Sequence, residues 1–222
     1  MVDNDPSNGK GFESAVAYAV AEQLGFPADK VTWTRVGFDE ANAKPGGFDF
    51  DINQFTITDD RKKVVDFSSG YYTVAQTVIT VDGSPISGAT SPAELKDAKL
   101  GAMNGTIGLQ AITASIDPAT PPQVFDDNSL AAQALQNGQV DGLVVDLPTA
   151  FYMTGAQLDN GKVIGQLKAP SGDAEQLGLL LAKDSALTAC VTSAVDALSV
   201  DGTLASLETE WLVGSSTAPV LG

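Results

Sequence analysis

The chain contains no histidine and a single cysteine, and only 12 lysine and arginine residues stand against 28 aspartate and glutamate residues. Without histidine, catalytic triads and dyads that use imidazole are excluded, as are metal sites with imidazole ligands. The single cysteine, Cys190, excludes an intrachain disulfide and Cys-x-x-Cys chemistry, and its Ala/Val-rich surroundings predict an inert core thiol. We expect no catalytic residue, no metal site and no cofactor.

Basic residues and long apolar runs are also scarce. The formal net charge of −16 argues against nucleic acid and anionic membrane surfaces, because both are bound through clustered Lys and Arg. The longest apolar run, residues 177–182, is far shorter than the roughly 20 residues of a membrane span. The first residues lack the basic start and apolar core of a signal peptide. A hydrophobic share of 43% is typical of a globular protein.

Alternating helix-type and strand-type patterns predict an α/β protein with largely parallel sheets. Residues 12–24 are expected to form a helix, because their apolar side chains fall on one face. Ser91, Pro92 and Glu94 predict a helix start with a capping box. Strands are expected at residues 31–36, 48–56, 72–81, 100–103 and 140–145. Further helices or helical turns are expected at residues 59–65, from 106, at 130–135, from 148, and at 185–198 and 203–212.

The order of these elements predicts two α/β lobes. Lobe 1 is discontinuous and comprises residues 1–82 plus 179–222, and lobe 2 comprises residues 83–178. The chain is expected to cross between the lobes near residues 81–91 and 168–178.

Arg61 is the first candidate for ligand binding. Ligands of open α/β sheets bind at the carboxyl ends of strands, and Arg61 follows the predicted strand that ends at Thr56. It is one of only two arginines in the chain. A guanidinium binds a carboxylate through two parallel hydrogen bonds, and a threonine hydroxyl adds a third donor. The alternative is a surface arginine in a polar turn.

Two further strand ends carry candidate ligand-binding residues. Gly105 and Thr106 lie in a strand-to-helix turn, where backbone N–H groups and a hydroxyl can bind an anion. The alternative there is an ordinary Asn-Gly turn. Asp146 follows the predicted strand 140–145 and suits a ligand ammonium, although it could equally cap the next helix. Together the three positions are suited to a zwitterion.

Residues 56–72 have the sequence Thr-Ile-Thr-Asp-Asp-Arg-Lys-Lys-Val-Val-Asp-Phe-Ser-Ser-Gly-Tyr-Tyr. This stretch resembles the signature of the polar amino-acid-binding proteins of ABC importers, the solute-binding proteins of the family 3 type. Further motifs resemble that family in the same order along nearly the whole chain. They are Gly11-Phe12-Glu13, Gly105-Thr106, residues 141–146, and Asp201-Gly202-Thr203 with Trp211.

The resemblance implies a type II periplasmic-binding-protein-like fold, in which two α/β lobes joined by two crossover segments close on the ligand. It implies that Arg61, Thr56 and Thr106 bind the α-carboxylate, that Asp146 binds the α-ammonium, and that Phe38 packs on the ligand side chain. The implied partners are a small amino acid and the membrane subunits of an ABC importer, with only indirect membrane contact. The implied location is periplasmic or extracellular, after removal of a signal peptide. Asn53 and Gln54 replace the small residues usual before the Thr56 position. The full set of expected ligand-binding residues is Phe38, Asn53, Gln54, Thr56, Arg61, Gly105, Thr106 and Asp146.

The chain also departs from the family pattern. Only ten residues precede Gly11, and none resembles the family's first strand, so the first strand of lobe 1 is expected to be missing. An unpaired sheet edge would favour self-association, and a truncated scaffold that no longer binds ligand is one alternative function. A dehydratase-like enzyme is the other, and it would need a carboxylic acid such as Glu13 or Glu175 in the pocket.

The ligand side chain stays open at this point. Asn53 and Gln54 favour a polar neutral side chain. Asp49 and Asp51 favour a basic one, unless strand alternation points them into solvent.

Overall fold

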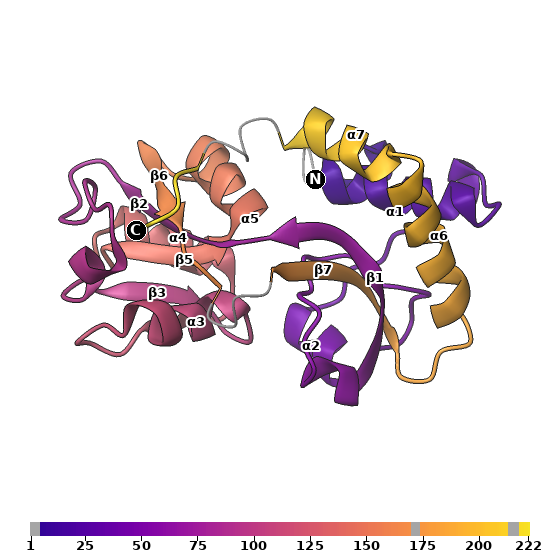
Figure 1. The fold of residues 1–222 in the computed structure, drawn as a ribbon, viewed down its shortest axis with the longest axis horizontal. Helices are drawn as coiled ribbons and strands as arrows, with labels where there is room; N and C mark the ends of the chain where they lie inside the picture. The colour runs from indigo at the N-terminus through magenta and orange to yellow at the C-terminus, as the bar shows by residue number, and fades with distance from the viewer. Residues whose placement is uncertain (1–4, 170–173, 213–217) are drawn as a thin grey trace. The chain divides into compact units, whose positions relative to one another are not determined.

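The computed structural model describes residues 5–169, 174–212 and 218–222, and the chain divides into two compact units (Figure 1). Unit 1 comprises Met1–Thr73 and Gln176–Val213, and unit 2 comprises Val74–Glu175 and Gly214–Gly222. Within the described ranges, every helix is too short or too polar to cross a membrane.

Unit 2 is built on a five-stranded mixed sheet with the strand order β4-β3-β5-β2-β6. Strand β3 pairs in parallel with β4 and β5, whereas β2 pairs antiparallel with β5 and β6. The strands are β2 (Gln76–Val81), β3 (Leu100–Met103), β4 (Gln123–Phe125), β5 (Gly142–Asp146) and β6 (Gly161–Gln166).

The helices of unit 2 follow the strands, as expected for α/β units. The predicted capping box is present, because the Glu94 carboxylate accepts hydrogen bonds from the backbone N–H groups of Thr90 and Ser91. Asp127 caps the helix α4 by accepting a hydrogen bond from the Leu130 N–H at 2.8 Å. The helical elements are η4 (Pro92–Leu95), α3 (Ile107–Ala111), η5 (Ile112–Ile116), α4 (Asn128–Gln136), α5 (Leu147–Tyr152) and η6 (Met153–Gln157).

Both faces of the five-stranded sheet are buried. Val78 and Val144 belong to one hydrophobic cluster, which also includes residues of α3 and η5. Their strand neighbours Ile79, Leu143 and Val145 belong to a second cluster, which includes residues of α4 and α5. Successive strand residues point to opposite faces, so a sheet with two covered faces requires continuous apolar runs instead of alternation.

Strands β1 (Val65–Val74) and β7 (Glu175–Ala182) form a two-stranded sheet that belongs to unit 1 except for the end residues Val74 and Glu175, which belong to unit 2. Three helices contact one another beside it (Figure 1). These helices are α1 (Phe12–Gln23), α6 (Thr188–Val200) and α7 (Thr203–Trp211). The shorter helical elements are α2 (Phe38–Ala43) and the 3₁₀ turns η1 (Pro6–Asn8), η2 (Ala28–Lys30) and η3 (Arg61–Lys63).

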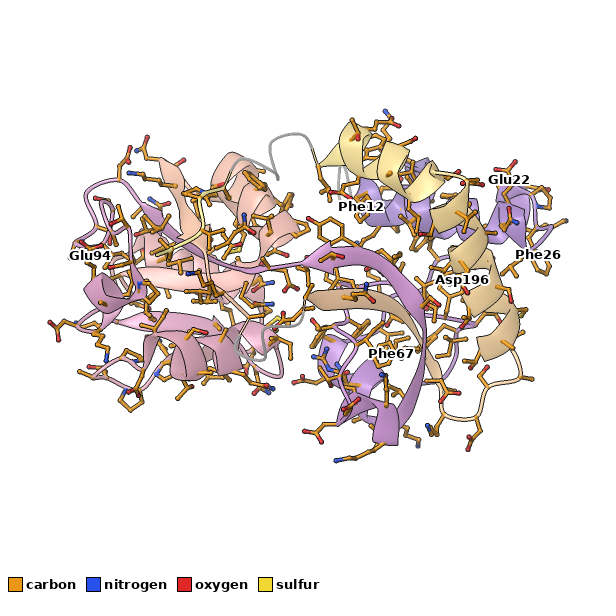
Figure 2. The ribbon with its side chains drawn as sticks, in the orientation of Figure 1. Phe12, Glu22, Phe26, Phe67, Glu94 and Asp196 are labelled. Carbon is orange, nitrogen blue, oxygen red and sulfur yellow. The ribbon has the colours of Figure 1, made fainter. Side chains whose placement is uncertain are left out.

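Helix α1 confirms the helix predicted from residue 12. Its buried side includes Val16 and Val20, which are fully buried, and Phe12, whose ring meets Tyr72 edge-on at a centroid distance of 5.3 Å (Figure 2). Gly11 precedes the helix with a φ of 95°, a conformation that a residue with a Cβ atom adopts only with strain. Glycine is therefore required at the start of α1.

Two strands predicted for unit 1 are wrong. Residues 31–36 belong to no strand of the described structure, and residues 48–56 form only single bridges, at Asp51 with Leu180 and at Thr56 with Leu177. Strand-type composition describes how well side chains fit a sheet surface, but a strand also needs a neighbour with which to exchange hydrogen bonds. The local sequence does not encode that neighbour.

The strand predicted at residues 72–81 covers β2, which starts at Gln76, and only the end of β1, which begins at Val65 and ends at Val74. Strand β2 belongs to the compact unit 2, whereas the sequence analysis predicted it in lobe 1. Residues 214–222 also belong to unit 2 instead of the predicted lobe 1. In that segment, Leu221 is buried and Val220 forms a β-bridge with Gln166. Strands β4, β6 and β7 were not predicted.

The prediction of a buried Cys190 is wrong. Cys190 is exposed on α6, and its thiol donates a hydrogen bond to the Leu187 carbonyl at 3.1 Å. The buried face of α6 consists of Val191, Ala194, Val195 and Leu198. The helix is apolar over most of its surface, so composition alone did not distinguish the buried face from the exposed one.

Gly108 permits the close approach of α3 to β5, and we expect Gly108→Ala to destabilise the protein. A methyl group at Gly108 would lie 2.5 Å from the Val144 carbonyl oxygen, a backbone atom, whereas one at the exposed Gly155 would meet nothing within 4 Å. Gly108→Ala should therefore lower the free energy of unfolding by about 1–3 kcal/mol, measured by urea unfolding. Gly155→Ala is the matched control and should change it little. Equal stability of the two variants would contradict this account of α3.

Candidate functional site

Arg61 is held in a defined position in unit 1. Its Nη1 donates a hydrogen bond to the Thr56 carbonyl at 2.8 Å, and its guanidinium carbon lies 5.5 Å from the centroid of the Phe38 ring. A guanidinium above an aromatic face is attracted by the ring quadrupole, and this attraction adds to the hydrogen bond in fixing the side chain. The structure therefore brings three of the predicted residues together in one place.

The ring of Phe38 is supported from below by the core of unit 1. It stacks on Phe55 at a centroid distance of 4.6 Å and an interplanar angle of 9°. Phe55 is fully buried in a cluster with Val65 and Leu180. The ring beneath Arg61 therefore has little freedom to move.

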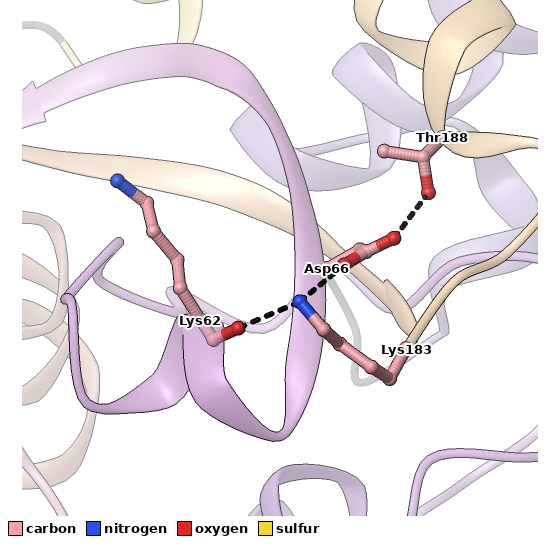
Figure 3. Close-up of polar contacts among 4 residues, drawn as sticks. All are labelled: Lys62, Asp66, Lys183 and Thr188. Carbon is pink, nitrogen blue, oxygen red and sulfur yellow. Dashed lines mark hydrogen bonds and ion pairs between the residues drawn. The ribbon is translucent and has the colours of Figure 1, made fainter.

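A second set of contacts fixes the turn that carries Arg61 (Figure 3). Lys183 donates to the Lys62 carbonyl at 2.8 Å and pairs with Asp66 at 3.1 Å, while the Thr188 hydroxyl donates to Asp66 at 3.0 Å. Burial raises the pKa of the Asp66 carboxyl, but these hydrogen bonds and the Lys183 charge outweigh it and lower the pKa. The ends of β1 and β7 are thereby joined to η3.

The same side chains border a cavity of about 530 Å³ in unit 1. Ile57, Ser68 and Gln176 also line it, but none of the residues predicted to bind ligand does. Arg61 itself does not line the cavity, although its chain neighbour Lys62 does.

The Glu13 carboxylate binds the backbone between Asp51 and Thr56, a contact that was not predicted from the sequence. Glu13 Oε1 accepts hydrogen bonds from the Gln54 N–H at 2.7 Å and from the Tyr71 hydroxyl at 2.6 Å. Gln54 has a φ of 50°, which is uncommon for a residue other than glycine. The Glu13 contact therefore stabilises a strained turn directly before Thr56, which is itself buried.

Glu13 and Asp51 lie close enough to repel each other. Burial raises the pKa of the Glu13 carboxyl, although the Tyr71 and Gln54 hydrogen bonds oppose this. Burial, and then the charge of Glu13, raise the pKa of Asp51 from 3.8 to about 6. Asn53, by contrast, is exposed.

Unit 2 positions the remaining candidates at the ends of two neighbouring strands. Gly105 has a φ of 71° in the turn after β3, and the Thr106 hydroxyl donates to the Met103 carbonyl at 2.7 Å. Asp146 is the last residue of β5, and its Oδ1 accepts a hydrogen bond of 2.6 Å from Gln76 Nε2. The Asp146 side chain does not cap α5, which removes the alternative considered for it.

Residues 1–214 match the family model described as bacterial extracellular solute-binding proteins, family 3. The chain belongs to this family.

Individual relatives agree with the family assignment. The chain is 28% identical to an L-arginine-binding protein of Pseudomonas aeruginosa over 199 residues, which cover 86% of this chain and 75% of that protein. It is 29% identical to the L-cystine-binding protein TcyJ of Escherichia coli over 202 residues, covering 90% and 73%. The crystal structure of the arginine-, lysine-, histidine-binding protein ArtJ from Geobacillus stearothermophilus superposes with a TM-score of 0.73 at 26% identity, covering 90% of this chain and 85% of that one. The two-lobed type II fold predicted from the sequence is thereby confirmed.

The structure groups the predicted residues of this family 3 protein into two sets. Phe38, Thr56 and Arg61 lie together in unit 1 with Gln54 nearby, while Gly105, Thr106 and Asp146 lie in unit 2. Their roles as ligand contacts stay predictions. Sequence analysis missed the contact role of Gln76 and the part of Glu13 in shaping residues 54–56. An isolated glutamine gives no pattern. Glu13 was named as a candidate acid and as part of the family's helix-start motif, neither of which indicates a contact with residues 54–56.

We expect Asp51→Asn to raise stability at neutral pH. The pKa of Asp51 is about 6 in the folded protein and 3.8 ordinarily, so the folded protein binds a proton at the Asp51 carboxyl more tightly than the unfolded chain does. The resulting stabilisation is complete below about pH 4 and is lost as the pH rises through about 6. Asparagine cannot ionise, so Asp51→Asn should gain about 1–2 kcal/mol at pH 7, after allowing for solvent screening.

Urea unfolding between about pH 4 and pH 8 measures this effect. Asp49→Asn is the matched control, because Asp49 is exposed two residues earlier in the chain. A stability difference from the parent that does not grow with pH would show that the Asp51 pKa is not raised.

Proposed function

We propose that the protein binds an amino acid and delivers it to an ABC-type membrane importer, without chemical conversion. The observation that carries this proposal is the position of Arg61, whose guanidinium is held by the Thr56 carbonyl above the Phe38 ring. The family is described as extracellular, which supports action outside the cytoplasm.

The recognised part of the ligand is its zwitterionic group. The named ligands of the relatives are arginine, cystine, lysine and histidine, whose side chains differ in charge and size. They share an α-ammonium and an α-carboxylate. In the proposal, Arg61, Thr56 and Thr106 bind the carboxylate and Asp146 binds the ammonium.

The ligand side chain is proposed to be polar. Phe38 contributes an aromatic ring, and Gln54 and Asn53 contribute amide groups from the stretch before Thr56. Glu13 and Asp51 add acidic character to the same part of unit 1, which favours a ligand with hydrogen-bond donors in its side chain.

A thermal-shift screen against the common amino acids and cystine tests the proposal directly. A ligand at a hundred times its dissociation constant adds about 2.7 kcal/mol to the free energy of unfolding and raises the melting temperature. Absence of any shift, for a protein with a cooperative melting transition, would refute the proposal.

Self-association through a sheet edge also remains a prediction, which the native mass at increasing protein concentration tests.

Arg61→Ala should weaken binding of the ligand found in this screen by about 2–5 kcal/mol, because the carboxylate loses its charged partner. Isothermal titration calorimetry measures the loss. Arg35→Ala is the matched control, since it removes the same charge from an exposed position. If both variants bound like the parent, Arg61 would not be the carboxylate partner.

A further inference from the structure

Three polar side chains of unit 2 meet at the start of β2. Gln76 is the first residue of that strand and is only 4% exposed. Its Nε2 donates to Asp146 Oδ1 at 2.6 Å and to Glu175 Oε2 at 3.0 Å. One neutral amide therefore binds two carboxylates, of which one ends β5 and the other begins β7.

The contact between Gln76 and Asp146 follows from the register of the sheet. The two residues are Cα partners in the antiparallel pairing of β2 with β5, so their side chains are direct cross-strand neighbours. The Leu147 N–H donates to the Ala75 carbonyl at 3.1 Å and continues the pairing by one residue. The position of Gln76 relative to Asp146 is thus fixed by the backbone.

The orientation of the amide is also determined. Only its NH₂ group can donate to carboxylates, and the reverse orientation would place an oxygen against two negative charges. The Gln76 Oε1 atom is buried and accepts no hydrogen bond from the part of the chain that the structure describes. Burying an acceptor without a donor is unfavourable, so the two charge-assisted hydrogen bonds of Nε2 must outweigh this cost.

We propose that Gln76 is a positioning residue for the ligand's ammonium group and that Glu175 is a second carboxylate at the same position. Gln76 acts through Asp146, because its Nε2 hydrogen bond fixes the Asp146 rotamer. The same Nε2 also donates to the Glu175 carboxylate and keeps it beside Asp146. Two carboxylates held at one position favour a ligand that brings a positive charge and disfavour one that does not. The inference rests on the proposed function and adds two residues that determine specificity for the free α-amino group.

Ligand analogues separate this role from a structural one. Dissociation constants are measured for the amino acid found in the screen, for the same molecule without its α-amino group, and for its α-carboxamide. In Gln76→Met, the preference for the amino acid over the analogue without the amino group should fall about 10- to 100-fold. The preference over the carboxamide should stay unchanged. A merely structural role would reduce both preferences together and would overturn the inference.

Two further variants complete the test. Gln123→Met changes an exposed glutamine of β4 in the same unit and should alter neither preference. Glu175→Gln removes one charge while Gln76 still holds Asp146, so it should reduce the preference for the amino group by a smaller factor. It carries the test if Gln76→Met does not fold, and an unchanged preference in Glu175→Gln would then overturn the inference.

The outcomes also distinguish the two proposals. If the parent protein binds no amino acid, the proposed function itself fails. If the parent binds and Gln76→Met keeps the full preference for the amino group, only the positioning role of Gln76 fails.

Discussion

The antiparallel pairing of β2 with β5 is the constraint on which unit 2 depends. Strand β2 lies between β5 and β6, and its residues Val78 and Ile79 supply one side chain to each of the two hydrophobic clusters. The same register places Gln76 beside Asp146. A shift by one residue would turn every β2 side chain to the opposite face, so core packing and the geometry at Asp146 are specified together.

Unit 1 depends more on single side chains than on a large sheet. The carboxylate of Glu13 joins α1 to the turn at Gln54 and to β1 through Tyr71, although burial disfavours its charge, and that charge in turn raises the pKa of Asp51. Buried carboxylates that receive hydrogen bonds but also repel each other reduce stability, and they are commonly found near functional sites. The turn that they shape leads directly to Thr56 and Arg61.

Much of the fold could be predicted from local sequence. Helix α1 follows from one apolar face, η4 from its capping box, and β3 and β5 from short apolar runs beside turn residues. Residues 31–36 and 48–56 could not be predicted in this way, because their composition suits a strand while pairing depends on distant residues such as Leu177 and Leu180. The family resemblance, carried by a motif of seventeen residues, did not depend on these local assignments.

The candidate site likewise contains residues that could be predicted from the sequence and one that could not. Arg61, Thr56 and Phe38 could be named from the motif, and the structure brings them into contact. Gln76 could not be named, because its importance comes from a cross-strand pairing seventy residues away and from burial, neither of which leaves a local pattern.

The exposure of Cys190 has a practical consequence. It is the only cysteine in the sequence and lies at the surface of α6, outside the buried face of that helix. A maleimide dye would therefore attach at one known residue of unit 1 without prior removal of other thiols. A second cysteine introduced at an exposed residue of unit 2 would then give a donor–acceptor pair for single-molecule energy transfer on an otherwise unaltered chain.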